Sequence, residues 1–116
     1  MDMPNRKIKK YEQILLGILN ETAAFPTSTD TKYVVLTDKV KHFYQLLYFG
    51  WENDKQFSHQ IIMNFHIQEN GKIAVLENKT EIPLDIELLK LGVEMQDIVP
   101  LFIPEKERIY WGYGTV

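Results

Sequence analysis

Two runs of alternating apolar and polar residues flank an Asn-Gly pair, and this pattern constrains the fold more than any other feature. The runs cover residues 56–68 and 72–78, with Asn70-Gly71 between them. Period-two alternation is typical of half-buried strands, and Asn-Gly favours a tight hairpin turn because both residues tolerate positive φ. We therefore predict an antiparallel hairpin whose two-residue loop sets Ile67 opposite Ala74.

The preceding stretch, "HFYQLLYFGW" at residues 42–51, is apolar or aromatic on both faces of a predicted strand. An odd-length loop at residues 53–55 would set Trp51 opposite Phe57 and Leu47 opposite Ile61, joining two apolar faces. We expect this face to pack against the helices as core; its members on the stretch are Phe43, Leu47, Phe49 and Trp51. The other face would then expose an apolar patch that serves as a partner or dimer interface, formed by Tyr44, Leu46, Tyr48 and Ile62.

The remaining segments complete an α+β pattern in a single domain, residues 1–116. Apolar residues at helical spacing predict an N-terminal helix over residues 5–22, and residues 32–38 read as a strand. A short helix over residues 82–92 ends at Gly92 as a left-handed cap, followed by a helical turn over residues 94–99. The tail, residues 100–116, is expected to be extended. The predicted fold is thus an N-terminal helix, a mainly antiparallel sheet of at least four strands built as a meander of hairpins, and short C-terminal helices.

Composition excludes several classes of protein. The chain has 116 residues, 45% of them hydrophobic and no cysteine, which excludes disulfides and thiolate metal sites. It contains no apolar run of membrane-spanning length, and its N-terminus lacks the apolar region of a signal peptide. We expect a cytoplasmic protein that does not associate with membranes.

The charge distribution argues against a non-specific nucleic-acid binder. The formal net charge is -3, whereas such binders usually carry a basic surplus. The one basic cluster comprises Arg6, Lys7, Lys9 and Lys10 on the N-terminal helix. It is interpreted as a solvated helix face, with a strip of phosphate contacts as the alternative.

Candidate catalytic and metal-binding residues are few. His59 and His66 fall on opposite faces of one regular strand, and His42 lies apart, so no metal site is predicted. His66 and Glu77 are expected to be diagonal neighbours, which suits a surface pair more than an acid–base pair. Glu77 and Lys79 match half of a nuclease motif without the required upstream aspartate. The glycines show no phosphate-loop spacing, and we expect no cofactor.

Several segments, in order and spacing, resemble the XisI family over essentially the whole chain. "YQLLYFGW" resembles that family's YQLL..GW signature, "NGKIAV" resembles its DGKIWI, and "TEI" with "ELLKLGVEMQDIV" resembles its TE…ELV..GVPK.DIV. The chain departs from the pattern where the family has a second tryptophan, here Ala74, and where "NKTE" replaces DGTE. The tail also differs, and the strand before Asn70 aligns only with one extra residue. The matching positions are Tyr44, Gln45, Leu46, Leu47, Gly50, Trp51, Gly71, Lys72, Ile73, Thr80, Glu81, Leu88, Gly92, Val93, Asp97, Ile98 and Val99.

The resemblance implies a small α+β protein of largely cyanobacterial origin that controls excision of the fdxN DNA element, a site-specific recombination. It also implies a nuclease-like partner, XisH, a separate recombinase and no catalytic residues. Three hypotheses follow: a non-enzymatic regulatory factor that binds an XisH-like protein, a cofactor that contacts DNA directly, and a metal-dependent nuclease using Glu77 and Lys79. We expect the first, with DNA contacted only weakly or indirectly, and we expect a homo-oligomer.

Overall fold

The computed structural model describes residues 3–116, with side chains from residue 5 onward. Helix α1 (Met3–Ala23) precedes strands β1 (Thr31–Asp38), β2 (Phe43–Asn53), β3 (Gln56–Ile67) and β4 (Ile73–Asn78). Helix α2 (Leu84–Lys90), the 3-10 turn η1 (Met95–Asp97), strand β5 (Ile98–Pro100) and helix α3 (Glu105–Trp111) follow.

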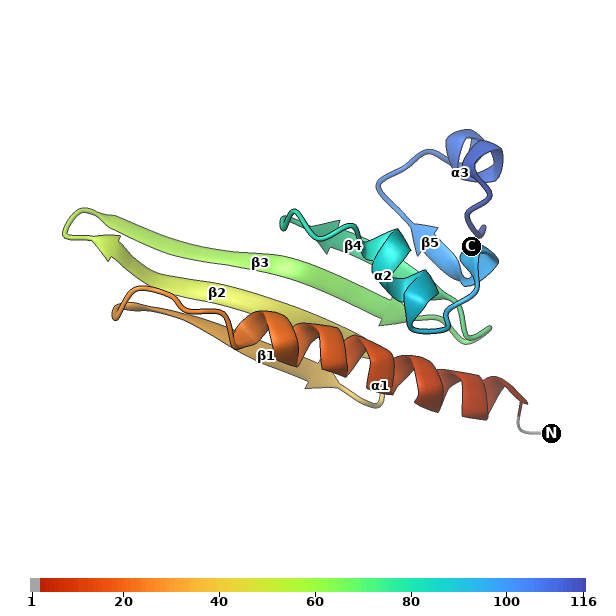
Figure 1. The fold of residues 1–116 in the computed structure, drawn as a ribbon, viewed down its shortest axis with the longest axis horizontal. Coiled ribbons are helices and arrows are strands. Elements are labelled where there is room, and N and C mark those ends of the chain that lie inside the picture. The colour runs from red at the N-terminus through yellow and green to blue at the C-terminus, as the bar shows by residue number, and fades with distance from the viewer. Residues whose placement is uncertain (1–2) are drawn as a thin grey trace.

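The strands form a single five-stranded sheet in the order β1-β2-β3-β4-β5 (Figure 1). Neighbouring strands are antiparallel except β4 and β5, which are parallel. This confirms the predicted α+β fold with its N-terminal helix and meander of hairpins.

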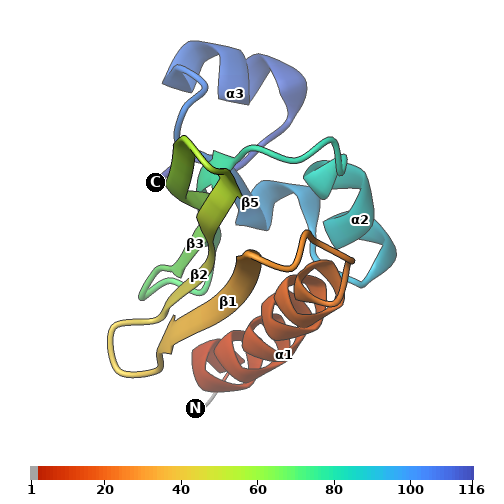
Figure 2. The ribbon, with the colours of Figure 1, turned by 90° about the vertical axis from the view of Figure 1, so that its left-hand side faces the viewer.

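Helix α1 lies across one face of the sheet, and α2 lies on the same side (Figure 2). The predicted stripe of α1 is buried, with Leu15 and Leu19 fully inaccessible. These side chains pack with Leu46, Met63 and Phe65 of the sheet into one hydrophobic core. Burial of an amphipathic stripe, which contributes roughly 1.5–3 kcal/mol per large apolar side chain, is what holds a helix of this kind on a sheet.

The assignment of the two sheet faces from sequence is wrong. Tyr44 and Leu46 have 0% exposed surface and Ile62 has 9%, so the predicted interface patch lies in the core instead of at the surface. Tyr48 is half-buried against the same core. Both faces of β2 are apolar, so alternation alone did not decide which one α1 covers. The outer strip, defined as the apolar side chains of β2 and β3 on the face away from α1 up to the bulge, is instead formed by Phe43, Leu47, Phe49, Trp51, Phe57 and Ile61.

A β-bulge explains how β3 contributes apolar residues to both faces. Leu46 pairs with Met63 while Leu47 pairs with Ile61, so Ile62 is an extra residue between them. An inserted residue reverses the alternation of the strand. Phe65 therefore faces the core, although Phe57 and Ile61 on the same strand face outward.

The hairpin predictions are confirmed in part. Trp51 pairs with Phe57 and Leu47 with Ile61 as expected, although the loop is shortened because Asn53 pairs with Gln56. The two-residue loop at Asn70-Gly71 is wrong. The structure instead has a three-residue loop, closed by bonds between residues 68, 71 and 72, with Gly71 at φ 85°. A type I turn followed by a left-handed residue is the usual geometry of such loops, and it sets Ile67 opposite Ile73.

The C-terminal segment is more structured than expected. Gly92 has φ 100° and the Val93 N–H donates to the Leu88 carbonyl, which confirms the left-handed cap. The expected extended tail is wrong where residues 105–111 form α3. The expected helical turn over residues 94–99 is confirmed in part, because η1 ends at Asp97 and residues 98–100 pair with β4 as β5. Tail residues also bond to this edge of the sheet, where the Gly114 N–H donates to the Ile98 carbonyl.

The distal half of the β2–β3 hairpin projects beyond α1 (Figure 1). We call residues 47–61 the hairpin arm. The arm makes the molecule elongated, with principal extents of 52 × 30 × 24 Å. The radius of gyration is 15.3 Å, whereas a compact chain of this length has about 13 Å.

Gly50 is required where the arm passes the start of β1. It has φ 132°, and a Cβ there would collide with the Asp30 carbonyl oxygen and lie 2.7 Å from the Thr31 Cα. We expect Gly50→Ala to lower the free energy of unfolding by more than about 2 kcal/mol in urea titrations.

The matched control is Gly17→Ala on α1, where a Cβ meets nothing within 4 Å. Alanine replaces glycine inside a helix there, so we expect stabilisation of about 0.5–1 kcal/mol. Equal effects of the two substitutions would contradict the close approach at Gly50.

Candidate functional site

A buried carboxylate links helix α1 to the turn η1, which follows α2 in the chain. Asp97, on η1, accepts a 2.6 Å hydrogen bond from the Tyr11 hydroxyl and lies 3.0 Å from Lys7 Nζ. Burial, followed by the hydrogen bond to Asp97, raises the pKa of Tyr11. The chemistry of this cluster is therefore that of a fixed ion pair that ties α1 to the segment after α2.

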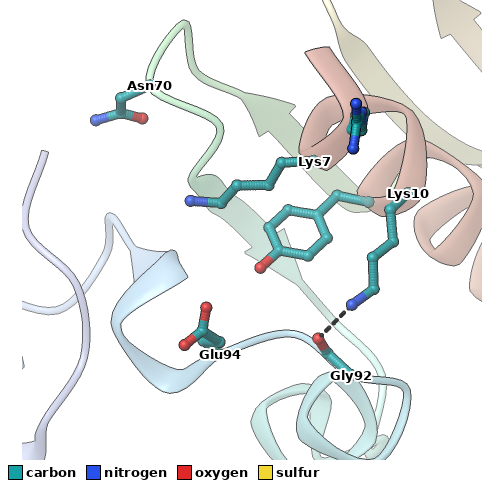
Figure 3. A pocket seen from close by; sticks show the side chains of 7 residues that line it. Lys7, Lys10, Asn70, Gly92 and Glu94 are labelled. Carbon is teal, nitrogen blue, oxygen red and sulfur yellow. Dashed lines mark hydrogen bonds between the residues drawn. The ribbon is translucent and has the colours of Figure 1, made fainter. Parts of the chain in front are cut away.

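A basic pocket opens beside this cluster (Figure 3). It has a volume of about 600 Å³, and its lining combines cations of α1 with one acidic side chain, Glu94, and the backbone near Gly92. Lys10 donates a 3.1 Å hydrogen bond to the Gly92 carbonyl across the pocket. The full lining is Arg6, Lys7, Lys10, Tyr11, Asn70, Gly92 and Glu94.

The pocket gathers three members of the predicted phosphate strip but not the fourth. Lys7 and Lys10 are already engaged by Asp97 and Gly92, and Arg6 is exposed. Lys9 lines a neighbouring hollow with His42. The arrangement concentrates positive charge on one side of α1, and phosphate contact by these residues stays a prediction.

A second polar network crosses from α1 to the start of β2. The buried Tyr44 hydroxyl donates a 2.6 Å hydrogen bond to Glu12, and His42 Nδ1 lies 3.0 Å from the same oxygen. Burial, and then this contact with Glu12, raise the pKa of Tyr44. Because the hydroxyl proton is directed to Glu12, His42 Nδ1 is the donor of the other bond. The network explains why Tyr44 can lie in the core.

The histidines lie in separate surroundings. His42 has φ 60°, and its carbonyl accepts bonds from the Ile67 N–H and His66 Nδ1. His66 also stacks on Phe43, with ring centroids 4.2 Å apart, whereas His59 is exposed on the arm. Among the described residues no three His, Cys, Asp or Glu side chains are grouped so that they could hold a metal ion.

The residues of the nuclease hypothesis are not assembled into a site. Glu77 pairs across the ladder with Asn64 and His66 pairs with Ala74, with a second bulge between the two pairs, and no ion pair joins His66 to Glu77 in the described part of the chain. Lys79 is exposed and donates a 3.3 Å hydrogen bond to Gln60. The diagonal contact of His66 with Glu77 stays a prediction.

The outer strip is an apolar surface, most of which lies on the hairpin arm. Trp51 and Phe57 are 51% and 52% exposed and pack edge to face with ring centroids 5.3 Å apart. Half-exposed aromatic rings of this kind each leave about 100 Å² of surface in water. A contiguous strip of this size is typical of an interaction surface.

Sequence reasoning found the basic cluster but missed Asp97 and Glu12 as buried or partly buried partners. Asp97 contacts residues 86 and 90 positions away, and Glu12 contacts one 32 positions away. Only the position of Asp97 inside a matching motif marked it in the sequence. No helix in the described part of the chain is long and apolar enough to cross a membrane.

Comparisons with known proteins agree on one family. A family model described as "XisI protein" matches residues 5–115. A crystal structure of a XisI-like protein from Anabaena variabilis is 25% identical, with a TM-score of 0.87, over 94% of this chain and 99% of that one. The fdxN element excision controlling factor XisI from the same organism is 24% identical and has a TM-score of 0.77, covering 93% and 97%. No curated protein sequence matched.

The raised pKa of Tyr11 predicts a pH dependence of stability. A tyrosine whose folded pKa is raised stabilises the fold fully below its unfolded pKa, about 10, and loses that contribution as pH rises toward the folded pKa. We expect the free energy of unfolding to fall above pH about 10. Tyr11→Phe should make this fall shallower, by at most about 1.4 kcal/mol per pH unit.

Urea titrations of both proteins between pH about 8 and about 11 measure the effect. The same variant should cost stability at neutral pH, by about 1–3 kcal/mol, because it leaves the buried Asp97 without its phenol donor. Parallel stability curves for the two proteins would contradict the assigned role of Tyr11.

Proposed function

Because the chain belongs to the XisI family, we propose that it is a regulatory accessory factor for excision of a DNA element, acting through protein contacts. The similar structure named fdxN element excision controlling factor supports the excision role. The proposed partner is an XisH-like, nuclease-like protein, and a separate recombinase cuts and joins the DNA. Such a protein acts in the cytoplasm, where the DNA is.

The observation that carries the non-enzymatic proposal is where the family-matching residues lie. Most of them are buried in the core or occupy turns: Tyr44, Leu46, Ile73, Leu88 and Val99 have no exposed surface. Gly50, Gly71 and Gly92 have positive φ, and Asp97 is paired with Lys7. The pattern thus describes a fold, without the convergent polar groups that a catalytic site needs.

Trp51, a matching residue whose large aromatic side chain is 51% exposed, points to where contacts are made. It belongs to the outer strip and packs edge to face with Phe57. Tryptophan is among the residues that most often dominate binding energy at protein interfaces. The proposed partner therefore binds the outer strip of the arm.

Direct DNA contact is the second candidate, supported by the basic pocket. The pocket offers less free charge than its composition suggests, because Lys7 and Lys10 are engaged and Glu94 lines the same space. The nuclease hypothesis has no comparable support, since Glu77 belongs to no group of three His, Asp or Glu side chains among the described residues.

Co-expression tests the protein-contact proposal. We expect the chain to co-elute with an XisH-like protein in size-exclusion chromatography at micromolar concentration. Trp51→Glu should raise the dissociation constant of the complex at least about tenfold, which is about 1.4 kcal/mol of binding free energy. The reason is that it removes an aromatic contact and places a charge in the apolar strip.

The matched control is Trp111→Glu on α3, a tryptophan that is 63% exposed and lies away from the strip. It should leave co-elution unchanged. Independent elution of the wild-type proteins, or equal loss with both variants, would count against the proposal.

A salt titration separates the DNA alternative. With a net charge of -3, we expect the chain to bind a fluorescent duplex no more tightly than about 10⁻⁴ M at physiological salt. Sub-micromolar binding whose salt slope falls in Arg6→Ala and Lys9→Ala would instead favour direct contact by the basic cluster.

A further inference from the structure

The hairpin arm has a strand edge that no other strand of the described chain pairs with. β3 pairs with β2 along its length, but β4 pairs with it only from Met63 onward. The last backbone bond on that side runs from the Lys79 N–H to the Ile62 carbonyl, and the Lys79 side chain reaches on to the Gln60 side chain at 3.3 Å. Residues 56–61 therefore form an open edge, visible along the upper side of β3 toward the hairpin tip in Figure 1.

The direction of the backbone groups on this edge follows from a bond on the other side of β2. The Trp51 N–H donates to the Asp30 carbonyl, so Trp51 directs its backbone groups toward β1. In an antiparallel ladder the direction alternates along each strand, so the residue paired with Trp51, Phe57, directs its groups away from β2. His59 and Ile61 follow with the same parity. Their N–H and C=O groups face the open edge.

Residues 56–61 themselves lack the features that usually prevent strand pairing, and the neighbouring Lys79 bonds the Gln60 side chain at the inner end of the edge. Natural edges carry charged residues, prolines or bulges that block another strand. Residues 56–61 read "QFSHQI", without proline, glycine, lysine or a carboxylate. An uncharged run of this kind is a template for an added strand.

We propose that this edge pairs with the same edge of a second copy of the chain, antiparallel about a two-fold axis at His59. In this register Phe57 lies opposite Ile61 of the second copy, and Ser58 lies opposite Gln60 of the second copy. His59 meets its own counterpart. The inference concerns self-association and stands apart from the proposed role in excision.

The second copy fits because the edge is complementary to itself. The outward-directed backbone groups of Phe57, His59 and Ile61 on both chains would form about six hydrogen bonds, the number expected for three directly bonded pairs. Aromatic and β-branched residues would face each other at both ends of the ladder, a favourable cross-strand combination. The ladder runs from Phe57 to Ile61 and stops before Ile62, whose carbonyl already accepts the bond from the Lys79 N–H.

The shape of the chain also favours a second copy. The projecting arm gives the chain a radius of gyration larger than that of a compact chain of its length, and an isolated hairpin is only marginally stable in water. Pairing two arms would place β1, β2 and β3 of each copy in one continuous six-stranded region. The outer strips of the two copies would then adjoin on one face.

Light scattering tests the pairing on the full chain. We expect a mass twice the chain mass of 13.7 kDa at micromolar concentration. Phe57→Lys, which places a charge on each edge, should raise the dimer dissociation constant at least tenfold. Tyr110→Lys on α3, 79% exposed, is the matched control and should leave it unchanged.

Cysteine cross-linking tests the register, because the chain contains no cysteine. Directly bonded antiparallel pairs have Cα atoms about 5.5 Å apart, within disulfide range. Oxidised His59→Cys should form a covalent dimer, whereas Tyr110→Cys should not. A monomeric wild-type mass, a dimer unaffected by Phe57→Lys, or equal cross-linking of both cysteine variants would overturn the proposal; His59→Cys cross-linking with a circular dichroism spectrum like the wild type supports it.

Discussion

The extra residue in β3 is the constraint on which the rest of the structure depends. By pairing Leu46 with Met63 and Leu47 with Ile61, the chain reverses the alternation of β3 at Ile62. In the part of β3 after the bulge, Met63 and Phe65 therefore face α1, whereas Phe57 and Ile61 on the arm face outward. One long strand thus serves the hydrophobic core in one half and an exposed apolar surface in the other.

Two polar links hold the covering helix in register on this sheet. Glu12 meets the Tyr44 hydroxyl over β2, and Lys7 with Tyr11 meets Asp97 beyond α2. Buried polar groups destabilise a fold unless they are hydrogen-bonded, so these contacts specify one position of α1 among the many that an apolar stripe alone permits. The same links engage the polar side chains of Glu12, Lys7 and Tyr11 within the fold, so these groups are not free to bind a ligand. What remains available for binding is the less engaged part of the basic cluster and the hairpin arm.

The sequence predicts the elements well where one physical signal dominates. The stripe of α1, the pairing of Trp51 with Phe57 and the cap at Gly92 follow from periodicity, cross-strand matching and glycine conformation. It misplaces the two faces because β2 is apolar on both, so only tertiary packing decides that Tyr44 is buried. It misses α3, whose exposed Tyr110 and Trp111 give no amphipathic pattern, and β5, which has only three residues. The partners of Asp97 lie too far away in sequence for spacing rules to find them.

Residue-resolved amide hydrogen exchange tests most directly the central claim, that the arm is an interaction element with an open edge. The account predicts that the amides of Ser58 and Gln60, bonded to β2, are protected at all concentrations. Those of Phe57, His59 and Ile61 should exchange freely in dilute solution and become protected as protein concentration rises. Alternating protection that does not change with concentration would contradict self-pairing, and protection of the whole set in dilute solution would contradict the open edge itself.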